Sequence, residues 1–206
     1  VLDYAILVIN GMDGVQSHTD TLWKLLKRYE IPTFIFVNKM DMEGTDKDAV
    51  FQNIRKKLDG DCVDFSSGDR DEQIAMADER LLDTYLDSGM VEVEDITEAI
   101  LDRKIFPCFW GSALKLSGVQ ELLDAMNTYM VMPAYNAEFG GRIFKISRDA
   151  KGERLTYMKV TGGSLKCREQ IEGTEGKVNQ IRIYSGARYE TVEEASAGTV
   201  CAVTGL

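Results

Sequence analysis

The residues Asn38, Lys39 and Asp41 follow directly on the apolar run 34–37, and their types and spacing could recognise a purine base. The amide of Asn38 can hydrogen-bond one edge of a purine, and the carboxylate of Asp41 can accept two N–H bonds from guanine N1 and N2. Lys39 can lay its alkyl chain along the base while its ammonium group stays in water. Ligands of open α/β sheets bind beyond the carboxyl ends of the strands, so this position favours a guanine site.

A second loop of small residues, Ser112, Ala113 and Leu114, follows another short apolar strand predicted over 104–110. Small residues let backbone N–H groups approach a base oxygen closely. Taken alone, the segment 38–41 could also be a polar turn after a strand. Two such loops, each after a strand and before a helix, favour guanine binding over that interpretation. An adenine nucleotide is disfavoured, because the carboxylate would face adenine N1 with no proton between them.

These two loops resemble the fourth and fifth guanine-nucleotide motifs of the translational GTPases. The resemblance runs along the whole chain and suggests elongation factor G and its paralogues, the ribosomal protection proteins of tetracycline resistance. Residues 1–16 look like the strand and loop after the second switch of elongation factor G. Segments 162–166, 192–198 and 203–206 are similar to the second domain of that family. The motifs are specific for the superfamily and do not separate its branches.

The resemblance implies that the full-length parent binds GTP and GDP with Mg²⁺ and hydrolyses GTP on the ribosome, where nucleotide state switches its domain arrangement. It implies either movement of tRNA and mRNA or release of tetracycline, with rRNA and ribosomal proteins as partners. Within this chain it implies that Asn38 and Asp41 bind guanine, that Lys39 stacks on the base, and that the loop 112–114 closes over it.

The motifs that would bind phosphate and perform catalysis do not occur in the sequence. There is no G-x-x-x-x-G-K-[ST] loop to cradle phosphates and no D-x-P-G-H segment. The only histidine, His18, lies at an expected helix start, and we interpret it as a surface or capping residue because hydrolysis needs a phosphate site beside it. We therefore expect no catalytic residue and no metal ligand within the chain.

The chain begins at Val1 without a methionine, and we expect it to be a segment of a larger factor. Such a segment holds the base-specific contacts and lacks the phosphate and Mg²⁺ contacts. We expect it to show no GTP hydrolysis above background by itself and to bind GDP weakly, if at all.

Composition excludes several other classes of function. The 206 residues are 44% hydrophobic, which is enough for one good core and a smaller one, and no apolar run is long enough to span a membrane. The net charge of −10 disfavours DNA binding but leaves room for a local rRNA contact. The cysteines Cys62, Cys108, Cys167 and Cys201 form no C-x-x-C pair, which disfavours zinc and fits a reducing cytoplasm.

The first 135 residues predict an α/β fold, a partial parallel sheet with helices of the P-loop GTPase type. Strands are expected at 4–9 and 33–37 and helices at 17–29 and 46–58. The first helix carries an apolar stripe that we expect to be buried, formed by Leu22, Leu25, Leu26 and Tyr29.

An acidic region over about 60–103 is predicted to be an insertion with helices at 71–86 and 94–101. The first of these has an expected apolar face of Met76, Leu81, Leu82 and Leu86. The crowded carboxylates could suggest a metal site. Their spacing does not resemble a ligand set, so we interpret them as solvated helix faces.

A helix at 118–130 and a linker at 136–141 lead to a region where apolar residues recur with period two. Turns every eight to twelve residues predict a small all-β barrel over 141–206. The pair Gly162–Gly163 and Gly198 are expected at tight turns that need positive φ.

An alternative function is a docking module for the ribosome or another partner, with a vestigial guanine loop. Basic residues of the barrel could then face rRNA, although we favour ordinary solubilising charges for most of them. These residues are Lys159, Lys166, Arg168, Lys177, Arg182 and Arg188.

Overall fold

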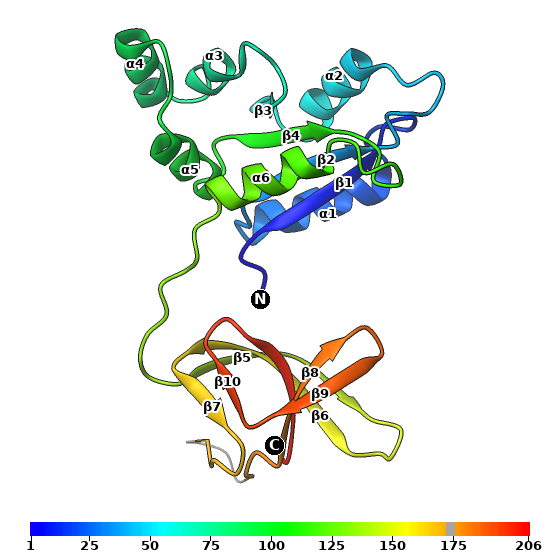
Figure 1. Cartoon of the computed structure of the whole chain (residues 1–206), viewed down its shortest axis with the longest axis vertical. Coiled ribbons are helices and arrows are strands. Elements are labelled where there is room, and N and C mark those ends of the chain that lie inside the picture. Colours follow the sequence, from blue (N-terminus) through cyan, green and yellow to red (C-terminus); the bar gives the residue numbers. More distant parts are fainter. Residues whose placement is uncertain (172–175) are drawn as a thin grey trace. The chain divides into compact units, whose positions relative to one another are not determined.

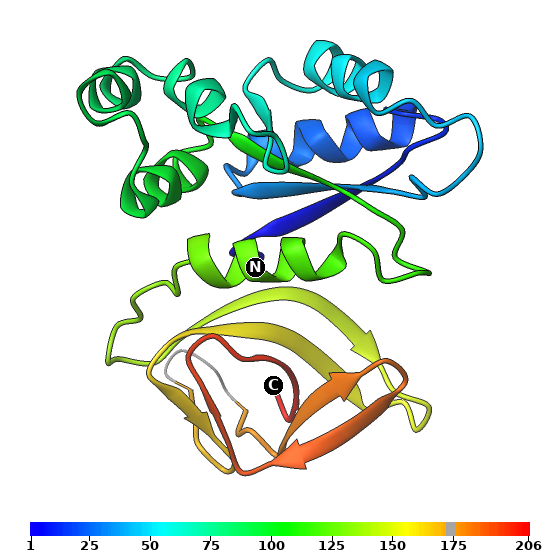
Figure 2. The ribbon, with the colours of Figure 1, turned by 45° about the horizontal axis from the view of Figure 1, so that its top comes forward.

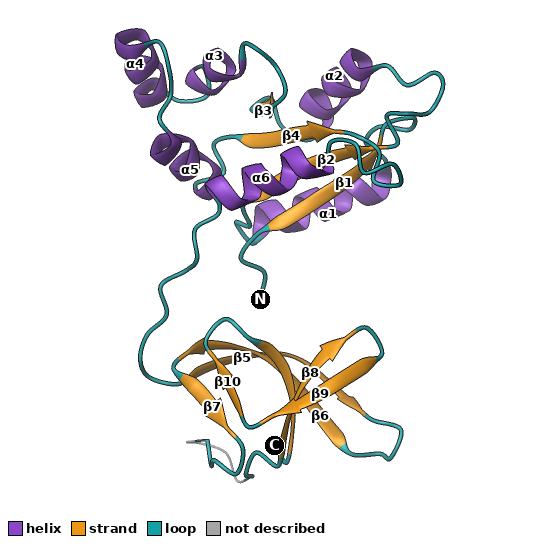
Figure 3. Cartoon of the chain, viewed as in Figure 1, coloured by secondary structure: helices purple, strands orange, loops and turns teal. Residues whose placement is uncertain are grey.

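The computed structural model describes residues 1–171 and 176–206 (Figure 1). Two compact units make up the chain: Leu2–Met132 forms an α/β unit, and Pro133–Leu206, together with Val1, forms a β unit. The mixed α/β fold class predicted from the sequence is confirmed, with helices and a parallel sheet in the first unit and antiparallel strands in the second (Figure 3).

The α/β unit is built on a parallel sheet with the strand order β1-β2-β4-β3. The strands are β1 (Ala5–Asn10), β2 (Thr33–Asn38), β3 (Cys62–Asp64) and β4 (Phe106–Trp110). The short strand β3 was not predicted. Because the strands are parallel, all of their carboxyl ends lie at one edge, and the loops that follow β2 and β4 emerge side by side.

Helices cover both faces of this sheet, as Figure 2 shows. On one face, α1 (Ser17–Arg28) and α2 (Lys47–Lys57) pack against alternate residues of the strands. The buried members of this core are Leu7, Ile9, Val15, Trp23, Ile35, Val37, Val50, Ile54, Cys62, Phe106 and Cys108. The period-two alternation along β2 and β4 sends neighbouring residues to opposite faces and supplies both cores. On β1 it supplies the first core alone, because Ile6 and Val8 are 42% and 56% exposed.

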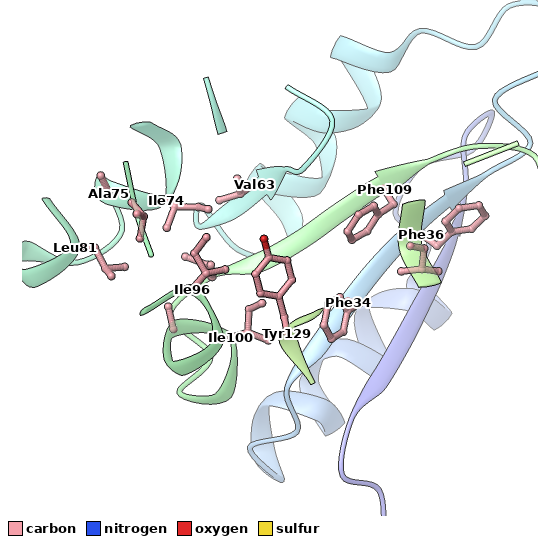
Figure 4. Packing of buried hydrophobic residues seen from close by; sticks show 14 residues of the cluster. Phe34, Phe36, Val63, Ile74, Ala75, Leu81, Ile96, Ile100, Phe109 and Tyr129 are labelled. Atoms are coloured by element: carbon pink, nitrogen blue, oxygen red, sulfur yellow. The ribbon is translucent and has the colours of Figure 1, made fainter. Parts of the chain in front are cut away.

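On the other face, α5 (Val93–Leu101) and α6 (Val119–Tyr129) pack against Phe34, Phe36 and Phe109. Figure 4 shows this cluster, in which the ring of Tyr129 lies between α5 and the strands. The insertion contributes to the same core, so it is an integral layer of the unit.

The predicted buried stripe of α1 is wrong. Trp23 is the buried residue of this helix, where its ring meets Phe106 edge-on at 4.7 Å between centroids and its Nε1 donates to the Leu58 carbonyl at 3.1 Å. Leu22, Leu25 and Tyr29 are 38%, 43% and 65% exposed. These side chains are exposed because β1 is the outer strand of the described sheet, so no further strand of that sheet covers the stripe.

The helix predicted over 71–86 is two helices, α3 (Arg70–Ala75) and α4 (Glu79–Ser88). Asp78 interrupts it because its carboxylate accepts the backbone N–H of Arg80 at 3.0 Å and so begins a new helix. Of the expected apolar face only Leu81 is buried, whereas Met76 and Leu86 are more than 70% exposed. The other predicted helices agree with the structure to within two residues.

The β unit contains a five-stranded antiparallel sheet, β5-β6-β11-β8-β9, and a two-stranded ladder of β10 and β7. Their bounds are β5 (Gly140–Arg148), β6 (Arg154–Gly162), β7 (Ser164–Lys166), β8 (Gln180–Ser185), β9 (Arg188–Val192), β10 (Glu194–Ser196) and β11 (Val200–Thr204). Both sheets enclose one apolar core, as in the predicted small barrel. Gly163 and Gly198 have φ of 53° and 90°, which confirms the expected positive φ at these two residues. The expectation is wrong for Gly162, which is the last residue of β6 and has no positive φ.

Two of the six basic residues considered for rRNA contact are not on the surface. Lys159 and Arg182 are each 5% exposed. The guanidinium of Arg182 forms ion pairs with Asp149 at 3.1 Å and Glu153 at 3.0 Å. Arg182 is therefore part of the unit's own structure, and neither Lys159 nor Arg182 is a solvated surface charge.

The helices in the described part of the chain are all too short or too polar to cross a lipid bilayer.

Candidate guanine-binding site

The loops after β2 and β4 are joined by backbone hydrogen bonds. Val37 and Trp110 are paired in the parallel register, and the N–H of Gly111 donates to the Val37 carbonyl at 2.9 Å. The N–H of Met40 donates back to the Gly111 carbonyl at 3.0 Å. Each loop therefore sets the position of the other at the carboxyl edge of the sheet.

Asn38 connects the same two loops through its side chain. Its Oδ1 accepts the N–H of Lys39 at 2.8 Å and the N–H of Ala113 at 2.9 Å. Its backbone carbonyl accepts the N–H of Gly11 at 2.8 Å, which brings in the loop after β1. Since Oδ1 is used in this way, the Nδ2 group is the part of Asn38 that can meet a base.

The segment 39–45 makes a sharp turn that is stabilised from within. Lys39 has a φ of 64°, a left-handed conformation that few residues other than glycine adopt, and its side chain is exposed. The hydroxyl of Thr45 donates toward the carbonyls of Met40 at 3.0 Å and Met42 at 2.8 Å. The following helix α2 begins with Asp46 as its cap, whose carboxylate accepts an N–H at 3.1 Å.

Asp41 carries the negative charge of the site. The ammonium of Lys115 lies 2.8 Å from its Oδ2. Hydrogen bonds from Lys115 and then Ser112 hold the pKa of Asp41 below its usual value of 3.8. The group is therefore a carboxylate throughout the neutral range, as an acceptor of two N–H donors must be.

The Lys115 ammonium shows that this carboxylate accepts an N–H donor from the other loop. It is an N–H donor held at hydrogen-bonding distance on Asp41, in the role that guanine N1–H and N2–H would take. Asp41 is thus an acceptor of N–H donors at the point where the two loops meet.

The loop 112–116 is fixed by backbone hydrogen bonds and close packing at its two ends. Ser112 is 3% exposed and exchanges two backbone hydrogen bonds with Ser117, at 3.0 and 3.1 Å. Leu114, by contrast, is 92% exposed. Gly111 lies so close to Ser117 that a Cβ atom built on it would be 2.0 Å from the Ser117 carbonyl oxygen. Only glycine fits at this crossing point.

The structure brings together the six residues that the sequence singled out. Asn38, Asp41, Ser112 and Ala113 are linked by the contacts described above, while Lys39 and Leu114 flank them with exposed side chains. Sequence reasoning assigned no role to Thr45 or Lys115. A Thr or Ser just before a helix and a Lys directly after the small-residue loop were the signals available for them.

His18 lies exposed in the first turn of α1. Among the described residues, no group of three or more His, Cys, Asp or Glu side chains is arranged to hold a metal ion.

The first unit is a parallel sheet flanked by helices, with two interlocked loops at its carboxyl edge, and an antiparallel β unit follows it. This arrangement is that of a nucleotide-binding α/β protein with an added β domain. Residues 1–132 match the family model for the elongation factor Tu GTP binding domain, and residues 138–206 match that for elongation factor G domain 2. The chain belongs to the family of translational GTPases that includes elongation factor G and the tetracycline resistance proteins.

Individual relatives agree with this assignment. The chain is similar to tetracycline resistance protein TetP of Clostridium perfringens, with 30% identity over 100% of this chain and 36% of the relative. It is similar to TetW of Butyrivibrio fibrisolvens, with 30% identity over 97% of this chain and 35% of the relative. It is also similar to elongation factor G of Mycoplasma genitalium, with 27% identity over 100% of this chain and 41% of the relative.

A crystal structure of a protein from Thermus thermophilus shares the fold, with a TM-score of 0.76 and 22% identity over 98% of this chain and 38% of that one. The chain thus spans a little over a third of the length of the relatives it matches. These matches favour a GTP-binding factor over the docking module that the sequence left as an alternative.

Proposed function

We propose that this chain is the guanine-recognition segment and second domain of a ribosome-associated GTPase. The observation that carries the proposal is the ionised carboxylate of Asp41, held where the loops after β2 and β4 meet and already bound to an N–H donor at 2.8 Å. The family to which the chain belongs supports the same function. The guanine-binding segment would extend over 1–135, with its insertion at about 60–103, and the second domain over 141–206.

Each residue of the site has a distinct part in this proposal. Asp41 accepts guanine N1–H and N2–H, which adenine cannot offer. Asn38 binds the base through Nδ2 while its Oδ1 holds the two loops together. Lys39 covers one face of the base with its alkyl chain. The second loop closes over the base with Ser112, Ala113 and Leu114.

The ligand is GTP or GDP, and bound GTP supplies the phosphoanhydride bond that the whole protein hydrolyses with Mg²⁺. The residues of this chain bind and orient the base. Since the sequence contains no phosphate-cradling loop, we expect the chain by itself to hydrolyse no GTP above background and to bind GDP weakly. Measurable turnover or submicromolar GDP affinity of the 206-residue chain would contradict this.

The whole protein would act on the ribosome in the cytoplasm. Two activities are consistent with the relatives: translocation of tRNA and mRNA, as for a member of the elongation factor G branch, and protection against tetracycline, as for a member of the resistance branch. Expression in a tetracycline-sensitive host discriminates between them. Raised resistance supports protection, and complementation of a strain depleted of elongation factor G supports translocation.

The central test is Asp41→Asn in the whole protein. Replacing the carboxylate by an amide exchanges an acceptor for a donor, so affinity should fall for GDP and rise for xanthosine diphosphate, whose C2 carbonyl accepts a hydrogen bond. A change of preference of about 10- to 100-fold is expected from the loss of charge-assisted hydrogen bonds. Asp48→Asn, at an exposed position in the first turn of α2, is the matched control and should change neither affinity. An unchanged preference in Asp41→Asn contradicts the proposed function.

A further inference from the structure

A buried carboxylate lies next to the loops 38–45 after β2 and 111–116 after β4, which we call the two base loops. Asp64, the last residue of β3, is 6% exposed, and it belongs to neither loop. Its Oδ1 accepts three hydrogen bonds: from the indole Nε1 of Trp110 at 2.9 Å, from the N–H of Ser66 at 2.9 Å and from the hydroxyl of Ser66 at 2.7 Å.

The second oxygen of Asp64 faces a different element. Its Oδ2 lies 2.6 Å from the ammonium of Lys47, the first residue of α2. The same ammonium donates to the hydroxyl of Ser66 at 2.9 Å and lies 5.1 Å from the centre of the Trp110 ring, a cation–π distance. One carboxylate therefore connects the ends of β3 and β4 with the start of α2.

Two partners of Asp64, Trp110 and Lys47, are each attached to one of the base loops. Trp110 directly precedes Gly111, whose N–H and carbonyl bind Val37 and Met40. Lys47 lies two residues after Thr45, whose hydroxyl binds the carbonyls that close the turn after Asn38. The two loops thus meet directly at Gly111, Asn38 and Asp41, and they are joined once more through Asp64.

We propose that Asp64, Lys47 and Trp110 form a positioning cluster that sets the spacing of the two base loops and so tunes discrimination between guanine and other bases. This inference rests on the proposed function, and it concerns residues outside both base loops. The three side chains act through Gly111 and Thr45, so they are positioning residues.

The chemistry of Asp64 allows its two connections to be broken separately. Trp110→Phe removes the indole donor and keeps an aromatic ring beside Lys47 and Phe51. Lys47→Met removes the ion pair and leaves the three hydrogen bonds on Oδ1. Asp64→Asn keeps an oxygen at Oδ1 and places an amide against Lys47, so it should behave like Lys47→Met.

The chain offers matched controls for both changes. Trp23→Phe removes one indole hydrogen bond, to the Leu58 carbonyl at 3.1 Å, in the same unit. Lys24→Met removes one ion pair, to Asp20 at 2.6 Å, on an exposed helix face. These controls report what loss of such bonds does when the base loops are not involved.

The experiment measures the GDP-to-ADP affinity ratio of the whole protein and its variants at a temperature where all are folded. ADP carries the same diphosphate as GDP, so the affinity ratio reports the contribution of the base alone. We expect the ratio to fall by about threefold to tenfold in Trp110→Phe, Lys47→Met and Asp64→Asn, and by less than about twofold in the controls. The double variant of Trp110 and Lys47 should lose less than the product of the two effects, because both act through one carboxylate.

A second readout needs no nucleotide. Hydrogen exchange at the backbone N–H groups of Met40 and Ala113, which join the loops, should accelerate in the three variants and not in the controls. Unchanged exchange and an unchanged ratio would overturn the positioning role while leaving the proposed function intact. A wild-type protein with no preference for GDP would instead overturn the proposed function, and the exchange measurement would still decide the structural role of the cluster.

Discussion

The Nζ atom of Lys115 lies 2.8 Å from the Oδ2 atom of Asp41, and the two residues come from different loops. The pair neutralises the carboxylate that guanine is proposed to bind. Both side chains reach solvent, with 63% of Lys115 and 25% of Asp41 exposed, so the bond can open without unfolding the loops. In the proposed function, guanine and Lys115 would therefore compete for the same oxygen atom.

Replacing Lys115 should favour the ligand. In Lys115→Met the carboxylate has no internal competitor, so GDP affinity of the whole protein should rise. An exposed ion pair is weak, which limits the gain to about fivefold. The gain should be largest at low salt, because salt screens the competing pair in the wild type. Titrations at two salt concentrations check this, with Lys24→Met as control. A fall in affinity would show that the ammonium assists guanine binding.

The buried carboxylate of Asp64 should make stability depend on pH in the acid range. Burial by itself would raise the pKa of Asp64, but hydrogen bonds from Lys47, Ser66 and Trp110 outweigh it and place the pKa below its usual 3.8. A lowered pKa in the folded state contributes stability above 3.8 that is lost as the pH falls below that value.

The wild type should accordingly exceed Asp64→Asn in free energy of unfolding by about 1 kcal/mol at about pH 7, a value kept low because the Lys47 partner is 41% exposed and solvent screens the pair. The difference should shrink as the pH falls below 3.8. Denaturant unfolding between about pH 7 and pH 3 measures it, and Asp20→Asn, at a surface pair, should show little difference at any pH. A difference that persists unchanged at the acid end would argue against the charge as its source.

Gly111→Ala should disrupt the second base loop. The added Cβ would lie 2.0 Å from the carbonyl oxygen of Ser117, a backbone atom that cannot move aside without opening the loop. We expect a loss of about 2–4 kcal/mol in the free energy of unfolding of the α/β unit, together with loss of the preference for guanine.

Gly60→Ala provides the comparison, because no atom lies within 4 Å of a Cβ at that position. It should leave stability and binding nearly unchanged or stabilise slightly. Thermal unfolding and GDP titration of both variants test the prediction. Similar behaviour of the two would mean that Gly111 is not the crossing point of the loops.

Arg182→Met should destabilise the β unit without a direct effect on the base site. The variant leaves the carboxylates of Asp149 and Glu153 without their shared guanidinium and removes a contact with the Tyr189 ring, 4.7 Å from the Arg182 Cζ. About 1–2 kcal/mol of stability should be lost, measured by denaturant unfolding. The exposed Arg188→Met is the control and should cost little. Equal stability of the two variants would contradict the structural role of Arg182.

The two base loops could be predicted because their signals are local. Asn38, Asp41 and the small residues 112–114 each follow an apolar strand, and parallel strands must end at the same edge. The change from strand–helix alternation to period two marks the passage to the β unit in the same local way.

Burial along α1 could not be predicted, because periodicity shows that a helix has an apolar face and not what covers it. The stripe through Leu22 and Leu25 overhangs the outer strand β1, whereas Trp23 meets the sheet. The break at Asp78 was likewise hidden, since a capping side chain and a solvated helix residue look the same until the N–H it binds is known.

The sequence by itself determined that a carboxylate and an amide three residues apart follow a buried strand, and that a loop of small residues follows another. Only the tertiary structure decided that Lys115 lies on Asp41 and that Asp64 joins Trp110 to Lys47. The physical reason is range: residues close in the chain fix the strands and turns, while these contacts bridge 17 to 74 positions and exist only after the strands align.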